Sequence, residues 1–230
     1  MTDSTLSSSV PPAGPPANAP FAAGPTPAPP PLSPGWATAA TAIHGIQQIA
    51  KPILLSLTPA GLGTIAVDLR SQEYVWQHSI EDFPVAPADV AISTYPIEGD
   101  APGLAGTRLG LDPLLWMIGL HAFGGDRASW LRHDDKYRLK WWPDLDLLPA
   151  TPEQIHVVRT SVKSLMTVEK LAHAAKLPVE QVQPVVNALS LMNALRRIEG
   201  KGGSPVRPPM AGVVAAQPDR VRGRHVRRGG

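Results

Sequence analysis

Histidine and acidic side chains lie together at His133, Asp134 and Asp135, and His121 precedes them in the sequence. Imidazole and carboxylate groups bind divalent metal ions, and the same groups act as general acids and bases in catalysis. The spacing of these residues matches no ligand template, and His133 falls in a segment expected to be a loop. A solvated charged turn therefore explains the cluster better than a metal site or an enzyme using His121, His133 and Asp135.

A second acidic pair, Asp144 and Asp146, flanks Leu145. Two carboxylates at this spacing could share acid–base work only in a cleft that shifts one pKa, and nothing in the sequence indicates such a cleft. The chain has no phosphate-binding glycine loop and no Gly-x-Ser-x-Gly motif. It has no cysteine, which excludes a thiol nucleophile and a Cys-ligated metal. We therefore expect a non-enzymatic protein without a metal ion or a cofactor.

Tryptophan is frequent among the aromatic residues, with six Trp beside three Tyr and three Phe. Trp141 and Trp142 are adjacent, and neighbouring residues of an extended segment point to opposite faces. One of the two is expected to pack between two parts of the chain and the other to be exposed. Because exposed Trp is enriched in binding hot spots, the pair is the predicted partner interface. The alternative is that both pack within the core or between domains.

The elements that position these residues differ along the chain. Residues 1–36 hold 11 of the 27 prolines and one charged residue, Asp3, which predicts a disordered arm. Residues 37–200 carry 14 Lys and Arg and 17 Asp and Glu, so the body is mildly acidic. Residues 201–230 carry seven basic residues and one acidic residue. The positive charge therefore belongs to the tail, which argues against a nucleic-acid surface over the whole body.

Residues 37–150 predict a small α+β domain. Short runs rich in β-branched and aromatic residues indicate strands, and a nearly continuous apolar run predicts a buried helix. The expected elements are a helix over 37–57 that is kinked or restarted at Pro52, a hairpin of strands 64–69 and 74–77, a third strand over 90–95, and a helix over 111–123.

From residue 151 the pattern predicts an all-α module that ends at residue 199. Thr151, Pro152 and Gln154 have the spacing of an N-cap, a first-turn proline and a capping box. Apolar residues then recur at helical spacing. The expected helices run to about residue 164, from 167 to about 176 and from 179 to about 196, and residues 200–230 form the disordered basic tail.

Residues 167–182 read TVEKLAHAAKLPVEQV, and VVNAL follows at 185–189. This pattern resembles the helix-turn-helix of bacterial winged-helix domains over about residues 152–199. The resemblance implies that the helix beginning at residue 179 is the recognition helix. The turn lacks the glycine that is usual in the family, and the Gly- and Pro-rich sequence after Glu199 predicts no wing hairpin.

Together these features predict an α+β protein in which a small mixed domain precedes a winged-helix-like module. We expect a cytoplasmic regulatory or adaptor protein of bacterial type that binds a protein partner through Trp141 and Trp142 and does not insert into a membrane. The alternative is a DNA-binding regulator, in which polar residues of the recognition helix read bases and tail arginines bind phosphates. The residues of this alternative are Glu180, Gln181, Gln183, Asn187, Arg220, Arg222, Arg224, Arg227 and Arg228.

Overall fold

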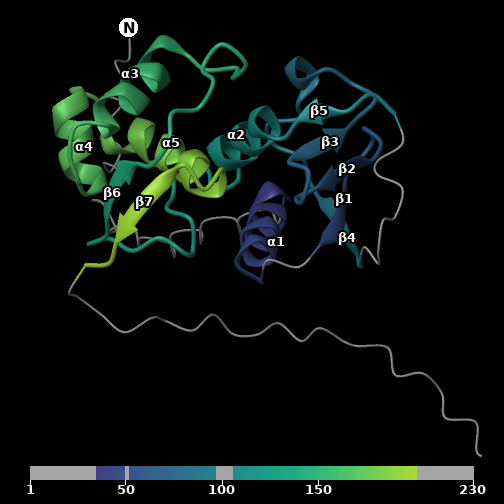
Figure 1. The fold of residues 1–230 in the computed structure, drawn as a ribbon. Coiled ribbons are helices and arrows are strands. Elements are labelled where there is room, and N and C mark those ends of the chain that lie inside the picture. The colour runs from purple at the N-terminus through teal and green to yellow at the C-terminus, as the bar shows by residue number, and fades with distance from the viewer. Residues whose placement is uncertain (1–34, 50–51, 97–105, 201–230) are drawn as a thin grey trace, which may run out of the picture. The chain divides into compact units, whose positions relative to one another are not determined.

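A computed structural model describes residues 35–49, 52–96 and 106–200 of the chain. These residues form a mixed α+β structure with a five-stranded sheet, a two-stranded sheet and five α-helices (Figure 1). The elements are α1 (Gly35–Ile49), β1 (Ile53–Pro59), β2 (Ile65–Asp68), β3 (Glu73–Val75), the 3-10 helix η1 (Ile80–Asp82), β4 (Val90–Pro96), β5 (Leu109–Gly110), α2 (Asp112–His121), β6 (Lys136–Leu139), α3 (Pro152–Ser161), α4 (Val168–Ala175), α5 (Val179–Leu191) and β7 (Leu195–Ile198). Most of the expected arm and nearly all of the expected tail lie outside the described residues.

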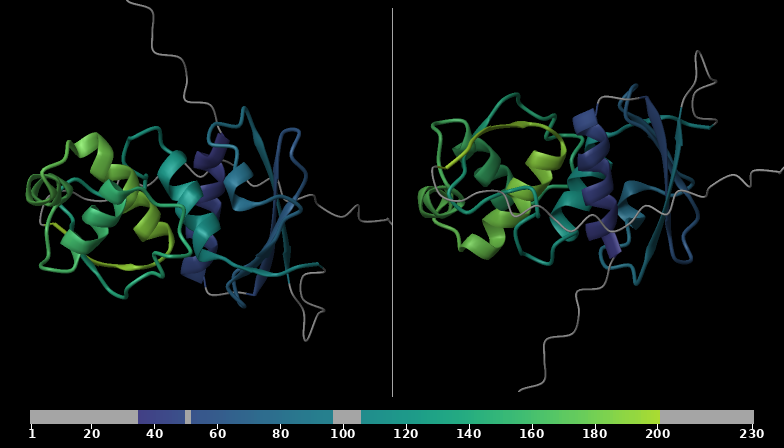
Figure 2. Two further views of the ribbon diagram at one scale, coloured as in Figure 1. Left: turned by 90° about the horizontal axis from the view of Figure 1, so that it is seen from above. Right: turned by 90° about the horizontal axis from the view of Figure 1, so that it is seen from below.

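The larger sheet is antiparallel throughout, with the strand order β4-β1-β2-β3-β5. In its centre Leu55 of β1 lies opposite Val67 of β2 and Thr94 of β4. Alternate residues of β1 are buried, so one face of the sheet carries the apolar side chains into the core. Figure 2 shows α1 and α2 between this sheet and the helices α3 to α5.

The first helix begins inside the segment expected to be an arm, because Gly35 and Trp36 belong to α1. The indole ring of Trp36 stacks on Phe83 with the ring centroids 4.7 Å apart, and its Nε1–H donates to the Pro84 carbonyl at 2.6 Å. Trp36 is 2% exposed, so it is a core residue that fixes α1 to the loop after η1.

The expectation of a helix up to residue 57 was wrong, since the helix ends at Ile49 and residues 53–59 form β1. Leu55, Leu57 and Pro59 are buried while the residues between them are half-buried, which is the two-residue period of a strand. The predicted hairpin is confirmed as β2 and β3, and the third strand as β4. β4 pairs with β1 on the far side of the sheet from the hairpin.

The buried helix α2 packs directly on α5. At the crossing Gly119 lies so close to the backbone of Ala188 that a Cβ atom built on the glycine would overlap the Ala188 Cα. The neighbouring side chains Leu115, Ile118 and Leu189 are all buried. This crossing joins the sheet-bearing half of the body to the helical half.

Capping residues mark the start of α3 and the end of α4 in the second half. Thr151 and Gln154 form the predicted capping box at the start of α3, with both reciprocal hydrogen bonds present. α4 ends at Ala175, and the next residue, Lys176, takes the left-handed conformation at φ 57°. Glycine usually occupies this position at the end of a helix. α5 continues through Pro184, which lies in its second turn.

The expected helix up to residue 196 ends earlier, at Leu191. Asn193 takes a left-handed conformation at φ 55°, and the chain reverses into β7. β7 pairs antiparallel with β6, and Tyr137 of β6 also bridges to Met166. Because β6 precedes residue 150, its ladder with β7 crosses the expected boundary between the two domains.

The close crossing of α2 and α5 predicts the effect of two glycine substitutions. Gly119→Ala is expected to lower the free energy of unfolding by about 1–3 kcal/mol, because the added methyl group has no space. Gly45→Ala, in the middle of α1 with nothing within 4 Å of its new Cβ, is expected to raise it by about 0.5–1 kcal/mol. Urea unfolding of both variants tests this, and equal effects would contradict the crossing.

Candidate functional site

An apolar hollow lies where the edge of the larger sheet meets the start of α2. Its volume is about 620 Å³. Trp141 and Leu147 close it from the segment that follows β6, and Asp112 is the charged residue among those that line it. The apolar lining residues are Tyr74, Ile80, Leu109, Leu111, Pro113, Trp141 and Leu147. A concave apolar surface with one carboxylate suits a largely apolar ligand with a positive group.

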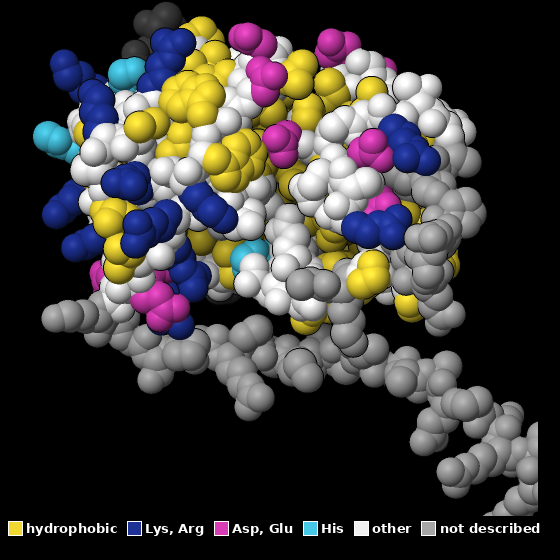
Figure 3. All heavy atoms as spheres, viewed as in Figure 1, with side chains coloured by type: hydrophobic (Ala, Val, Ile, Leu, Met, Phe, Trp, Pro, Cys, Tyr) yellow, Lys and Arg dark blue, Asp and Glu magenta, His cyan; other side chains and the backbone are white. Residues whose placement is uncertain are grey.

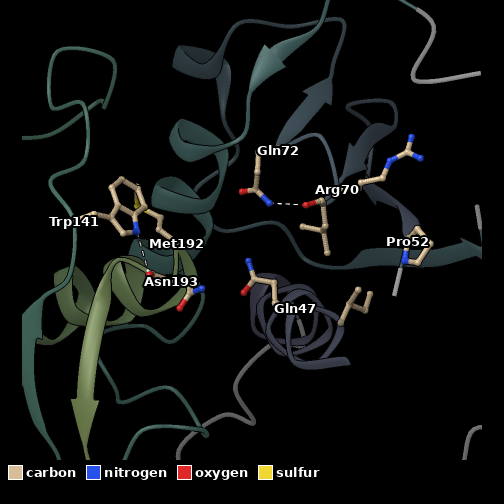
Figure 4. A pocket seen from close by; sticks show the side chains of 9 residues that line it. Gln47, Pro52, Arg70, Gln72, Trp141, Met192 and Asn193 are labelled. Atoms are coloured by element: carbon tan, nitrogen blue, oxygen red, sulfur yellow. Dashed lines mark hydrogen bonds between the residues drawn. The ribbon is translucent and has the colours of Figure 1, made fainter. Parts of the chain in front are cut away.

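A second hollow of about 590 Å³ lies on the other side of Trp141, between α1, the turn that joins β2 to β3, and the turn after α5. Figure 4 shows Gln47, Arg70 and Gln72 across this hollow from Trp141, Met192 and Asn193. Trp141 and Gln72 line both hollows. We call the two hollows together the Trp141 groove.

Trp141 is held in place by one hydrogen bond, from its Nε1–H to the Asn193 carbonyl at 3.2 Å. This bond joins the segment after β6 to the turn between α5 and β7. Trp141 is half-buried, whereas Trp142 is 50% exposed and lines a different, shallow hollow beside Asp144 and Asp146. The two tryptophans therefore have different surroundings, although β6 ends at Leu139 and the chain bends at Trp141.

Exposed apolar side chains continue the groove outward. Leu147 is 65% exposed and Leu109 is 38% exposed, and both line the hollow with Trp141. Figure 3 shows hydrophobic side chains around the hollow between the helical half and the sheet, with Asp and Glu side chains along it. A group of exposed apolar side chains around a concavity is typical of a binding surface.

The charged side chain in the lining of this hollow is acidic. Burial raises the pKa of the Asp112 carboxyl group, which lies at the start of α2. Glu81 and Asp82 follow Ile80 in the sequence, and Asp144 and Asp146 precede Leu147, all four of them exposed. Asp112 is the charged group in the lining of the apolar hollow, and it favours a ligand with a cationic group.

The helix α5 presents only part of the residues predicted to line a DNA groove. Glu180 and Gln181 are exposed, but Gln183 and Asn187 are 4% and 1% exposed. Asn187 Oδ1 accepts from the Ala128 backbone N–H at 3.1 Å and from the Gln183 amide at 2.9 Å. Its Nδ2–H₂ group donates to the Asp126 carbonyl at 2.8 Å. These two amides hold the loop after α2, and a nucleic acid cannot reach them in this arrangement.

The five arginines of the DNA-binding alternative, Arg220, Arg222, Arg224, Arg227 and Arg228, lie outside the described residues.

The structure does not bring His121, His133 and Asp135 to one site. His133 is exposed, and its Nδ1 lies 3.3 Å from the Glu169 carboxylate. His121 ends α2, with its ring 6.4 Å from that of Phe83. Asp135 is fully buried and accepts from the backbone N–H groups of Arg132 and Gly200. Within the described part of the chain, no three His, Asp or Glu side chains converge to hold a metal ion.

The buried Asp135 belongs to a polar joint that the sequence did not reveal. Its carboxylate lies 3.8 Å from the Arg197 guanidinium and accepts from the Tyr137 hydroxyl at 3.4 Å. Arg197 also donates to the Trp130 carbonyl at 2.7 Å. A buried charge is tolerated only when it is paired and hydrogen-bonded, and Asp135 meets both conditions.

Trp130 connects this joint to both halves of the body. Its ring stacks on His44 of α1 with the centroids 4.3 Å apart, and its Nε1–H donates to Ser190 Oγ of α5 at 2.9 Å. Burial and, secondarily, the Arg197 charge lower the pKa of His44. His44 follows the buried Ile43 and comes four residues after the buried Ala40, so it lies on the inward side of α1. This helical spacing is the sequence signal that could have predicted that His44 is partly buried.

No family model matches the chain, and neither a curated protein nor a solved structure matches it significantly. Among residues 35–49, 52–96 and 106–200, no helix combines the length and the hydrophobicity that crossing a lipid bilayer requires. The site therefore has to be judged by its own geometry.

The hydrogen bonds of Asn187 predict that its role is structural. Asn187→Ala is expected to lower the free energy of unfolding by about 2–3 kcal/mol, because it leaves buried partners unsatisfied. Gln181→Ala, on the exposed side of the same helix, is expected to change it by less than about 0.5 kcal/mol. Chemical denaturation compares the two, and a stable Asn187→Ala variant would contradict this role.

The environment of His44 predicts a dependence of stability on pH. Its pKa is lower in the folded protein than the ordinary value of 6.5, so the unfolded chain binds the proton more tightly. The neutral form of His44 therefore supports the fold above about pH 6.5, and the free energy of unfolding decreases as the pH falls below that value. His44→Phe keeps a ring on Trp130 but cannot be protonated, so its melting temperature should fall less between about pH 7.5 and pH 5. An equal fall in both proteins would assign the loss to other groups.

Proposed function

We propose that the protein is a non-enzymatic adaptor in a regulatory assembly and that it binds a partner protein through the Trp141 groove. The observation that carries this proposal is the half-buried Trp141 between two hollows, continued outward by Leu147 and Leu109. Exposed aromatic and aliphatic side chains around a concavity supply the desolvated centre that protein interfaces need. Trp142 lies beside this centre and extends the contact surface.

The partner that fits is a protein segment with large apolar side chains flanked by Lys or Arg. The apolar hollow has room for such side chains, and Asp112 lies in its lining. Glu81 and Asp82 follow the lining residue Ile80 in the sequence and are exposed, whereas Arg108 precedes the lining residue Leu109. Residues 35–125 contain eight Asp and Glu but three Lys and Arg, so the sheet-bearing half attracts cations as a whole.

The helical half supports the proposal as a scaffold. Its helices α3, α4 and α5 follow in the order that the winged-helix resemblance implies, and a strand follows the last of them. β7 does not form a hairpin with a later strand as a wing would. It pairs with β6, which precedes α3 in the sequence. We infer a winged-helix-like module that holds Trp141 through Asn193 and contributes one wall of the groove.

The test is a selection of binding peptides followed by substitutions at the rim. A displayed library of short random peptides is panned against the full-length protein, and the selected peptides should combine large apolar residues with flanking Lys or Arg. Leu147→Lys should weaken the selected peptide at least tenfold, because it removes exposed apolar contact and places a positive charge against a ligand that carries Lys or Arg.

The matched control is Val85→Lys, which changes an apolar residue that is 52% exposed and lines neither hollow. It should bind the selected peptide as the wild type does. Isothermal titration calorimetry measures both variants. Failure to select any peptide, or equal loss of binding in the two variants, would contradict the proposal.

A further inference from the structure

The outer face of the β6–β7 ribbon gathers four positive side chains. Along β6 the exposed residues alternate with buried ones, so Lys136 and Arg138 face outward while Tyr137 and Leu139 enter the core, and Lys140, directly after the strand, is also exposed. Arg196 of β7 is exposed and lies directly opposite Arg138. Figure 3 shows Lys and Arg side chains gathered over the part of the molecule where Figure 1 labels β6 and β7.

None of these four side chains forms an ion pair with a described residue. The next residue, Arg197, is different, because it is turned to Asp135 and Glu199 and its charge is matched there. Like charges directly opposite on paired strands destabilise a sheet. The Arg138–Arg196 pair is therefore a cost to the fold that a polyanionic ligand would remove.

We propose that the outer face of the β6–β7 ribbon, through Lys136, Arg138, Lys140 and Arg196, binds nucleic acid by its phosphates. A two-stranded ribbon fits the major groove of a DNA duplex, and cations that repeat every second residue, about 6.6 Å apart, lie along its length. The two arginines offer the planar donors that bind phosphate oxygens in pairs.

The chain beyond the ribbon adds to this charge. Gly200 follows β7 by two residues, and residues 201–230 contain seven Lys and Arg and one Asp. Residues 126–200 carry eleven Lys and Arg and nine Asp and Glu, so the helical half is basic where the sheet-bearing half is acidic. The nucleic acid therefore meets the end of the molecule that attracts it.

A lipid surface offers similar phosphates but fits this face less well. Binding at a membrane surface relies on apolar side chains that enter the interface beside the basic ones. Within the ribbon, the exposed large apolar side chain is Ile198, which is 41% exposed. The ribbon is also distinct from the exposed residues Glu180 and Gln181 of α5, of which one is acidic. The inference stands on the ribbon alone and does not depend on the Trp141 groove.

The experiment measures binding of the full-length protein to a fluorescent mixed-sequence DNA duplex between about 50 and 200 mM KCl. The wild type should bind with a steep salt dependence. Arg138→Gln combined with Arg196→Gln should weaken binding and reduce the slope of log K against log[salt] by about 2, since two phosphate contacts are lost. Its melting temperature should equal or exceed that of the wild type, because the opposed charges are gone.

The matched control combines Lys163→Gln with Lys176→Gln, which removes two exposed charges from the turns that follow α3 and α4 in the same half. This variant should keep the wild-type slope. Three results would overturn the inference: no binding of the duplex by the wild type, wild-type binding by the Arg138 and Arg196 double variant, or a loss in the control at least as large as in that variant. Binding of phosphatidylserine vesicles in place of the duplex would also overturn it and assign the face to lipid.

Discussion

The contact between α2 and α5 at Gly119 and Ala188 is the constraint on which the arrangement of the body depends. The two backbones meet without an intervening side chain, so α5 takes one position against α2. Asn187, one residue before Ala188, then reaches the loop after α2, and Ser190 reaches Trp130. The turn that follows α5 brings Asn193 to Trp141 and closes the groove. The Trp141 groove thus depends on one helix crossing.

The same crossing separates two surfaces of opposite charge. The apolar hollow at the edge of the larger sheet has Asp112 in its lining, whereas the β6–β7 ribbon presents cations that form no ion pair with a carboxylate of the described chain. In the polar joint the buried Asp135 is satisfied by Arg197, Tyr137 and backbone N–H groups. An adaptor with two such surfaces could hold a cationic protein segment at one end and a polyanion at the other.

Elements that are specified by residues close together in the sequence could be predicted from it. The capping box at Thr151 and the β-rich runs of β2, β3 and β4 were predicted and are confirmed. Residues 53–57 were misjudged because a short apolar run suits a helix or a strand until its pairing partners are known. Spacing along α5 identified one helical face, but burial by the loop after α2 decides that Gln183 and Asn187 lie inside. The groove depends on residues far apart in the sequence, so Trp141 was the lining residue that the sequence singled out.

The most direct measurement of the central claim is a ¹H–¹⁵N correlation spectrum of the tryptophan indole groups in the full-length protein, recorded while a selected apolar and cationic peptide is added. Single Trp→Phe substitutions assign the signals. The account predicts that the indole signal of Trp141, which lines both hollows, shifts strongly and that of Trp142 shifts with it. The signals of the buried Trp36 and Trp116 should stay in place. Shifts confined to Trp36 or Trp130, with Trp141 unchanged, would contradict the assignment of the groove.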